Sequence, residues 1–154
     1  DDGWLGASIY QQHHGDDGIY APPPLVLVAE QKTGSFVRQQ ILGGGISAAH
    51  DIADGGLAVA IAEMAMRSGF GAEIAVPKTG NLHGWAFGED QARFVVTTAD
   101  SQALIAAAKE AGIEITKLGM VSDQGELKFG DNDTISIADL NAVFEGCIPA
   151  LMAG

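Results

Sequence analysis

The sequence contains little cysteine and no long apolar run, and each shortage excludes a class of protein. A single cysteine, Cys147, excludes an internal disulfide and a zinc site built from cysteines. It lies on an apolar helical stripe, so we expect a buried, unreactive thiol. The 154 residues show neither a signal peptide nor an apolar run of membrane-spanning length, so a cytoplasmic protein is the expectation.

Basic residues are also scarce. Eight Lys and Arg face 20 Asp and Glu, which gives a formal net charge of −12. Nucleic acids and anionic membranes require clustered positive charge, so this composition argues against both as partners. It does not exclude nucleotide binding, because a magnesium ion can offset acidic groups locally. Hydrophobic residues make up 47% of the chain, enough to form a core.

The first twenty residues differ from the rest of the chain. The sequence begins Asp-Asp-Gly-Trp, without an initiator Met, and a polar stretch followed by three prolines at 22–24 forms a stiff linker. We expect a fragment of a longer protein. Residues 1–20 would be the remnant of a preceding domain with its linker, and residues 21–154 an intact domain.

Hydrophobic periodicity beyond the linker alternates between helical and extended segments. It predicts helices at 25–42, 55–67, 101–111 and 139–148, and strands at 46–50, 71–76, 93–98, 113–121, 127–129 and 134–137. We further expect Gly34 to kink or divide the first helix, residues 123–126 to form a hairpin turn, and Pro149 to interrupt the last helix. This order favours an α+β fold, a layered mixed β-sheet flanked by helices.

The segment His-Asp-Ile-Ala-Asp-Gly-Gly-Leu at 50–57 joins a short, buried strand to an apolar helix. Such a loop presents backbone N–H groups and the positive end of a helix dipole, which suit phosphate, while its carboxylates could hold a divalent metal. Asp54 could equally cap the helix. Asp51 has no local partner, which favours a ligand-binding role. For His50, a hydrogen-bonded packing role is favoured over metal ligation.

A second cluster, Gly88-Glu89-Asp90-Gln91, precedes the strand at 93–98. Gly88 permits close backbone approach to a ligand, Glu89 and Asp90 supply carboxylates, and the amide of Gln91 can donate and accept hydrogen bonds. A solvated acidic loop is the alternative. We expect both clusters to lie at one end of the same sheet, where ligands of such folds bind.

The segment at 50–57 resembles the pattern His-Asp-x-Ser-Asp-Gly-Gly-Leu of the formylglycinamidine ribonucleotide synthase family. Leu-Gly-Ala-Ser at 5–8 and Phe-Gly-Glu-Asp-Gln-Ala-Arg-Phe at 87–94 support the resemblance, which extends from Gly3 to about Ala150. Ala53 replaces the usual serine, so a hydroxyl near the nucleotide is missing. The implied fold is similar to the C-terminal domain of aminoimidazole ribonucleotide synthetase-related proteins.

This resemblance implies part of a ligase of purine biosynthesis that uses ATP and Mg²⁺ to convert formylglycinamide ribonucleotide to the amidine with glutamine-derived ammonia. By family analogy Asp51 and Gly88 contact ATP, Glu89 is a magnesium ligand, and Gln91 touches the substrate. The implied partners are a glutaminase subunit and a small accessory subunit. The family's catalytic histidine belongs to earlier domains, so no catalytic residue is assigned here and the fragment is expected to be inactive alone.

Two other functions stay open. The chain could belong to another member of the superfamily, such as aminoimidazole ribonucleotide synthetase, selenophosphate synthetase or thiamine phosphate kinase. It could also be a non-catalytic ligand-sensing or assembly module. A thermal shift with ATP and magnesium that Asp51→Ala abolishes would disfavour the module.

Overall fold

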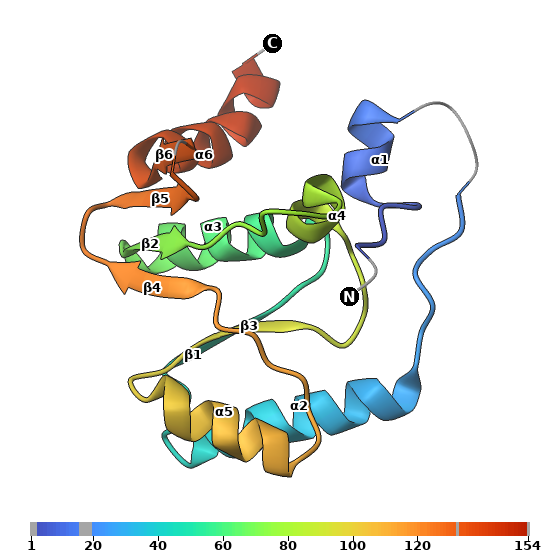
Figure 1. Cartoon of the computed structure of the whole chain (residues 1–154). Coiled ribbons are helices and arrows are strands. Elements are labelled where there is room, and N and C mark those ends of the chain that lie inside the picture. Colours follow the sequence, from blue (N-terminus) through green and yellow to red (C-terminus); the bar gives the residue numbers. More distant parts are fainter. Residues whose placement is uncertain (1–2, 16–19, 132, 154) are drawn as a thin grey trace. The chain divides into compact units, whose positions relative to one another are not determined.

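The computed structural model describes residues 3–15, 20–131 and 133–153, and the chain divides into two compact units (Figure 1). The first unit combines Asp1–Ala60 with Thr79–Lys117, and the second combines Ile61–Lys78 with Leu118–Gly154. Helix α3 (Gly56–Ser68) begins in the first unit and continues into the second. Each unit is built from segments that are distant in the sequence.

The first unit contains a two-stranded antiparallel sheet. Strand β1 (Ala48–Asp51) pairs with β3 (Phe94–Thr97), with Ala48 opposite Thr97 and Asp51 opposite Phe94. Four further helices belong to this unit: α1 (Ile9–His14), α2 (Leu27–Leu42), α4 (Leu82–Phe87) and α5 (Ser101–Glu110). The side chain of Asp100 accepts a hydrogen bond from the Ala103 N–H, so it caps α5.

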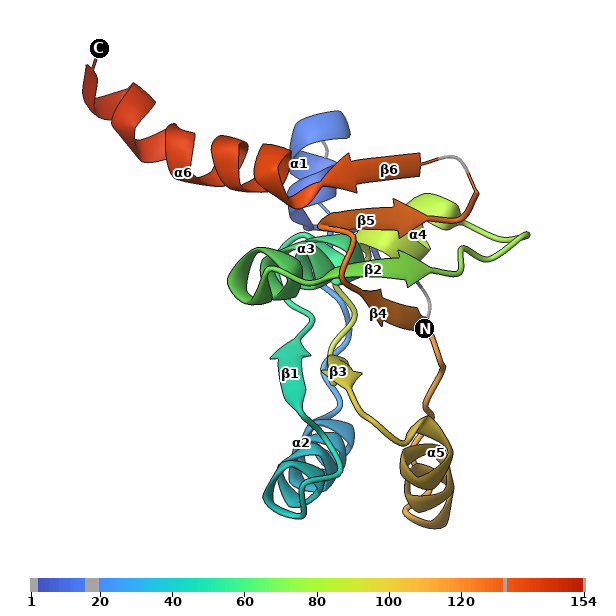
Figure 2. The same ribbon diagram turned by 90° about the vertical axis from the view of Figure 1, so that its left-hand side faces the viewer.

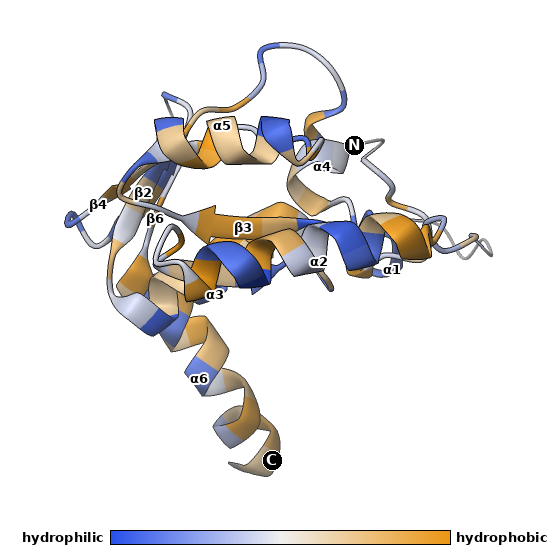
Figure 3. Ribbon diagram, turned by 90° about the horizontal axis from the view of Figure 1, so that it is seen from below, coloured by the Kyte–Doolittle hydropathy of each residue, from blue (hydrophilic) through white to orange (hydrophobic). Residues whose placement is uncertain are grey.

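Helices α2 and α5 pack with the β1–β3 sheet around an apolar core (Figure 2). Its buried centre is formed by Val37, Ile46 and Leu104, and Phe36, Phe94, Val96 and Ile115 pack against it. Strand β3 is hydrophobic along its length (Figure 3), which suits a strand that contributes two of these residues. Burial of each large apolar side chain stabilises the unit by about 1.5–3 kcal/mol.

The second unit contains a four-stranded mixed sheet in the order β4-β2-β5-β6. Its strands are β2 (Gly71–Ile74), β4 (Gly119–Ser122), β5 (Glu126–Phe129) and β6 (Asp133–Ser136). Strand β2 runs parallel to β5, and the other two pairings are antiparallel. Helix α6 (Ile137–Ala153) follows β6 directly. One antiparallel and one mixed sheet, together with helices, confirm the predicted α+β class.

Two predictions about the second sheet are wrong. Residues 123–126 do not make a hairpin, because β4 and β5 hydrogen-bond to opposite edges of β2 and the turn crosses that strand. The strand predicted at 113–121 begins only at Gly119. Turn-forming residues between two extended segments do not reveal whether a third strand lies between them.

The helices also differ from expectation. Helix α2 continues through Gly34 and α6 through Pro149, so neither residue divides its helix. The short helices α1 and α4 were not predicted. They contact each other, since the Tyr10 ring stacks on Phe87 with 5.1 Å between ring centroids. Helices of one or two turns depend on such tertiary contacts, because their own hydrogen bonds are too few.

The predictions of burial need two corrections. Strand β1 is largely exposed rather than buried, and only His50 in it is half-buried. Cys147 is free and exposed, because it lies in the stretch of α6 that starts at Ala142, where the side chains described are exposed. Hydrophobic residues recur along α6 (Figure 3), but an apolar stripe leads to burial only where another element covers it. No helix among the described residues has the length and apolarity needed to cross a membrane.

Candidate functional site

The two acidic clusters converge in the first unit. Residues 52–55, which we call the α3-entry loop, follow β1, and residues 88–91, which we call the acidic loop, lie shortly before β3. The Ile52 N–H donates to the Arg93 carbonyl oxygen at 2.9 Å, at the end of the sheet where Asp51 pairs with Phe94. The Gly55 N–H donates to Glu89 Oε1 at 2.8 Å. The expectation that both loops lie at one end of the same sheet is confirmed.

A third segment, residues 3–9, completes this arrangement, and we call it the N-terminal strap. The Glu89 N–H donates to the Trp4 carbonyl oxygen at 3.0 Å, and the Trp4 N–H donates to Asp90 Oδ2 at 3.2 Å. The Ile9 N–H donates to Glu89 Oε1 at 2.9 Å. The origin of residues 1–20 in a preceding domain stays a prediction, yet the strap is hydrogen-bonded to the acidic loop at three points.

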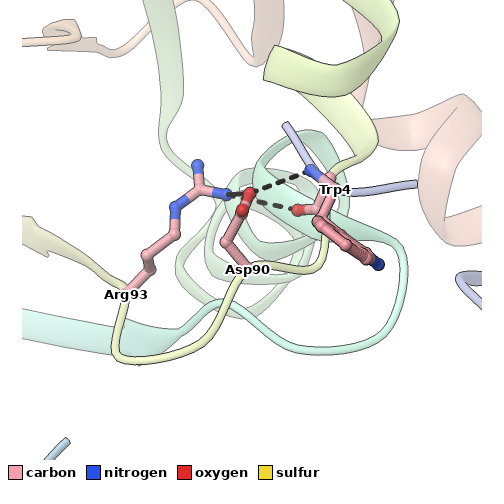
Figure 4. Close-up of polar contacts among 4 residues, drawn as sticks. Trp4, Asp90 and Arg93 are labelled. Carbon is pink, nitrogen blue, oxygen red and sulfur yellow. Dashed lines mark hydrogen bonds and ion pairs between the residues drawn. The ribbon is translucent and has the colours of Figure 1, made fainter. Parts of the chain in front are cut away.

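A largely buried ion pair supports the acidic loop from its far end (Figure 4). Arg93 Nη1 lies 3.2 Å from Asp90 Oδ2, and the two side chains are only 12% and 15% exposed. The same nitrogen donates to the Gly88 carbonyl oxygen at 3.3 Å. Burial lowers the pKa of the Arg93 guanidinium, and the neighbouring Asp90 carboxylate partly offsets that effect. The sequence marked Arg93 only as the start of a strand.

Glycines allow these segments to approach backbone to backbone. Gly56 has φ +72°, and a Cβ there would lie 2.6 Å from the carbonyl carbon of Phe87. A Cβ on Gly88 would collide with the Gly84 carbonyl oxygen and lie 2.9 Å from Gly3 Cα. The close approach predicted at Gly88 is therefore made by the chain's own backbone in this structure.

Comparison with known proteins shows the family. Residues 2–132 match the family described as AIR synthase related protein, C-terminal domain. The chain belongs to this family. The match covers both loops, the strap and the entire first unit apart from its first residue, so the site described above lies within the AIR synthase-related domain.

Its curated relatives are PurL subunits. The chain is 46% identical to the phosphoribosylformylglycinamidine synthase subunit PurL of Methylocella silvestris, over 99% of this chain and 21% of that protein. It is also 46% identical to the PurL subunit of Parvibaculum lavamentivorans, over 98% of this chain and 21% of that protein. The resemblance found in the loop motifs is confirmed, and the chain spans about a fifth of the length of these relatives.

Solved structures show the same fold. Thermotoga maritima PurL complexed with FGAR matches with a TM-score of 0.70 and 16% identity, over 82% of this chain and 23% of that one. The same protein complexed with ATP matches with a TM-score of 0.62 and 17% identity, over 71% of this chain and 21% of that one. At such identities the likeness concerns the fold of the AIR synthase-related domain alone.

Within this domain, the predicted site residues differ in their surroundings. The Asp51 carboxylate is 70% exposed and lies 3.8 Å from His50 Nδ1, which also hydrogen-bonds the Asp51 carbonyl oxygen at 2.6 Å. Gln91 is exposed, Gly88 is buried, and Glu89 is half-buried. Asp51 and Gln91 are therefore open to a ligand from solvent, whereas Glu89 already serves the chain's own structure.

Glu89 nevertheless suits a magnesium ion in this family's domain. No three His, Cys, Asp or Glu side chains gather as a metal site within the residues that the structure describes. Magnesium sites commonly take only one or two protein carboxylates, with phosphates and waters as the other ligands. Two backbone N–H groups hold Oε1 of Glu89, and none of the described residues donates to its Oε2. Glu89 therefore offers one oriented carboxylate, which is the number that a magnesium site of this type can use.

The residue that follows the acidic loop, Ala92, is strained. It has φ +62°, a left-handed conformation that favours glycine, and its N–H donates to Glu30 Oε1 at 2.6 Å. We expect Ala92→Gly to change the free energy of unfolding by less than about 1 kcal/mol, because relief of strain offsets the added freedom of the unfolded chain. Ala92→Val should lower it by about 2 kcal/mol, since β-branched residues tolerate positive φ poorly. Urea denaturation measures both, and equal losses would contradict the left-handed conformation.

Proposed function

We propose that this chain is the C-terminal part of the synthetase subunit of a phosphoribosylformylglycinamidine synthase. The reaction converts formylglycinamide ribonucleotide to formylglycinamidine ribonucleotide, with ATP as the energy source and glutamine-derived ammonia as the nitrogen donor. The observation that carries this proposal is the 46% identity to a curated PurL subunit over 99% of the chain. A glutaminase subunit and a small accessory subunit would be its partners, in the cytoplasm.

In this function the chain would bind and orient ATP, Mg²⁺ and the ribonucleotide, and would not itself supply a catalytic group. Asp51 and Gly88 would contact ATP beside the start of α3, where the first helical N–H groups favour phosphate. Glu89 would hold Mg²⁺, which when bound neutralises developing charge on the phosphoryl group. The exposed amide of Gln91 would donate to and accept from the ribonucleotide. We assign no catalytic residue to this chain.

A chimeric subunit tests the proposal. The matching fifth of the Methylocella silvestris PurL subunit is replaced by this chain, and amidine formation is measured with ATP, magnesium, formylglycinamide ribonucleotide and ammonia. We expect at least about a tenth of the parental rate, a loss of no more than about 1.4 kcal/mol in transition-state stabilisation. The chain by itself should show no turnover.

Two results would contradict this assignment. A chimera that folds but forms no amidine would favour another member of the superfamily or an assembly module. Amidine formation by the isolated chain would contradict its role as one part of a larger active site. Parental PurL, assayed in parallel with ammonia, establishes that the assay detects the product.

A further inference from the structure

The backbone N–H and the backbone carbonyl of Trp4 are both hydrogen-bonded to the acidic loop, through two consecutive residues of that loop. The Glu89 N–H donates to the Trp4 carbonyl oxygen, and Asp90 Oδ2 accepts from the Trp4 N–H. Arg93 approaches Asp90 from the other side and neutralises its charge (Figure 4). Because Asp90 and Arg93 are largely buried, solvent screens this pair little.

The strap also contacts the side chain of Glu89. Five residues beyond Trp4, the Ile9 N–H donates to Glu89 Oε1, which also accepts from the Gly55 N–H. The Glu89 carboxylate is therefore oriented by two donors from segments that are far apart in the sequence. One donor, Gly55, belongs to the loop that opens α3. The other, Ile9, is in place only while the strap lies along the acidic loop.

We infer that Asp90 is a positioning residue for Glu89: by holding the strap through Trp4, with Arg93 as its counter-ion, it sets the direction in which the Glu89 carboxylate presents Oε2. The functional part of this inference rests on the proposed role of Glu89 as a magnesium ligand. Its structural part concerns only this chain's own hydrogen bonds. Partners that orient a metal ligand typically change metal affinity by about 10–100-fold when they are removed.

Two substitutions and one control separate positioning from general stability. Asp90→Ala removes both the acceptor for the Trp4 N–H and the partner of Arg93. Asp90→Asn keeps an oxygen for the Trp4 N–H and loses the charge. Asp100→Ala is the matched control, because it removes an aspartate of the same unit whose side chain caps α5 by accepting from the Ala103 N–H. All are made in the chimeric subunit.

The first measurement is hydrogen exchange at the amides of Ile9 and Gly55, without nucleotide or metal. Asp90→Ala should accelerate exchange at both amides by about tenfold, because loss of the hydrogen bond to Trp4 lets the strap open locally more often. Asp90→Asn should restore part of the protection, and Asp100→Ala should leave it unchanged. Unchanged exchange in Asp90→Ala, or equal acceleration in Asp100→Ala, would overturn the inference whether or not the chimera is active.

The second measurement is the magnesium concentration that gives half-maximal amidine formation. We expect about a tenfold increase in Asp90→Ala with kcat at saturating magnesium reduced less than about threefold, because the ligand is misdirected rather than removed. An active chimera whose magnesium dependence does not change would overturn the positioning role. An inactive chimera with unsubstituted Asp90 would instead count against the proposed function, and hydrogen exchange would still decide the structural part. Should Asp90→Ala fail to fold, Asp90→Asn carries both measurements.

Discussion

Gly56→Ala is expected to lower the free energy of unfolding of the first unit by about 2–5 kcal/mol. Two costs add. An alanine at φ +72° adopts a left-handed conformation that costs about 1–2 kcal/mol. Its Cβ would also lie 2.6 Å from the carbonyl carbon of Phe87, and because that neighbour is backbone, relief requires α3 and the end of α4 to separate. Overpacking of this kind costs about a further 1–3 kcal/mol.

Gly44→Ala is the matched control for this substitution. Gly44 has φ +74°, close to that of Gly56, but a Cβ there meets nothing within 4 Å. It should therefore show the conformational cost alone, about 1–2 kcal/mol. Urea denaturation followed by tryptophan fluorescence suits both variants, since Trp4 and Trp85 are the two tryptophans of the chain and lie in the first unit. Equal losses in the two variants would contradict the close approach of Gly56 to Phe87.

Glu89→Gln is expected to reduce amidine formation by the chimeric subunit about 100-fold, a loss in transition-state stabilisation of about 2.7 kcal/mol. Glutamine retains an oxygen that can accept from the Ile9 and Gly55 N–H groups, so the loops should stay joined. It removes the negative charge with which the Glu89 carboxylate would attract a magnesium ion. The stability of the first unit should fall by no more than about 1–2 kcal/mol, as charge-assisted hydrogen bonds become neutral ones.

The control for this prediction is Glu110→Gln, the same chemical change at an exposed residue in the last turn of α5. It should leave both activity and stability unchanged, because surface substitutions of this kind have small effects. Rates are measured over a range of magnesium concentrations, and unfolding is measured on the same preparations. Full activity in Glu89→Gln would remove Glu89 from the metal site, and an equal loss in Glu110→Gln would trace the effect to net charge.

Much of the local structure follows from the sequence. The helical period of Leu104 and Ala108, with Asp100 before it and Gly112 after it, defines α5 to within a residue. The glycine pair at 55–56 marks the start of α3 in the same way. Such signals depend on residues within about four positions of one another, so they can be recognised without knowledge of the fold. The order of the second sheet does not follow, since the antiparallel and parallel neighbours of β2 come from later in the chain.

The candidate site, too, could be predicted from the sequence only in part. Motifs in the sequence were sufficient to indicate the family, the two loops and their place at one end of a sheet. They did not reveal that Glu89 joins Ile9 to Gly55, that Asp90 holds Trp4, or that Gly56 and Gly88 accommodate backbone from this same chain.

The physical reason is distance along the chain. Trp4 and Asp90 are separated by 86 residues, and Ile9 and Glu89 by 80. Periodicity and capping describe short-range interactions, whereas hydrogen bonds between such distant residues form only after the intervening elements have packed. The sequence by itself therefore indicated the family and nominated the residues that we propose to bind a phosphorylated ligand with its metal. Only the tertiary structure decided which of them face solvent and which hold the loops together.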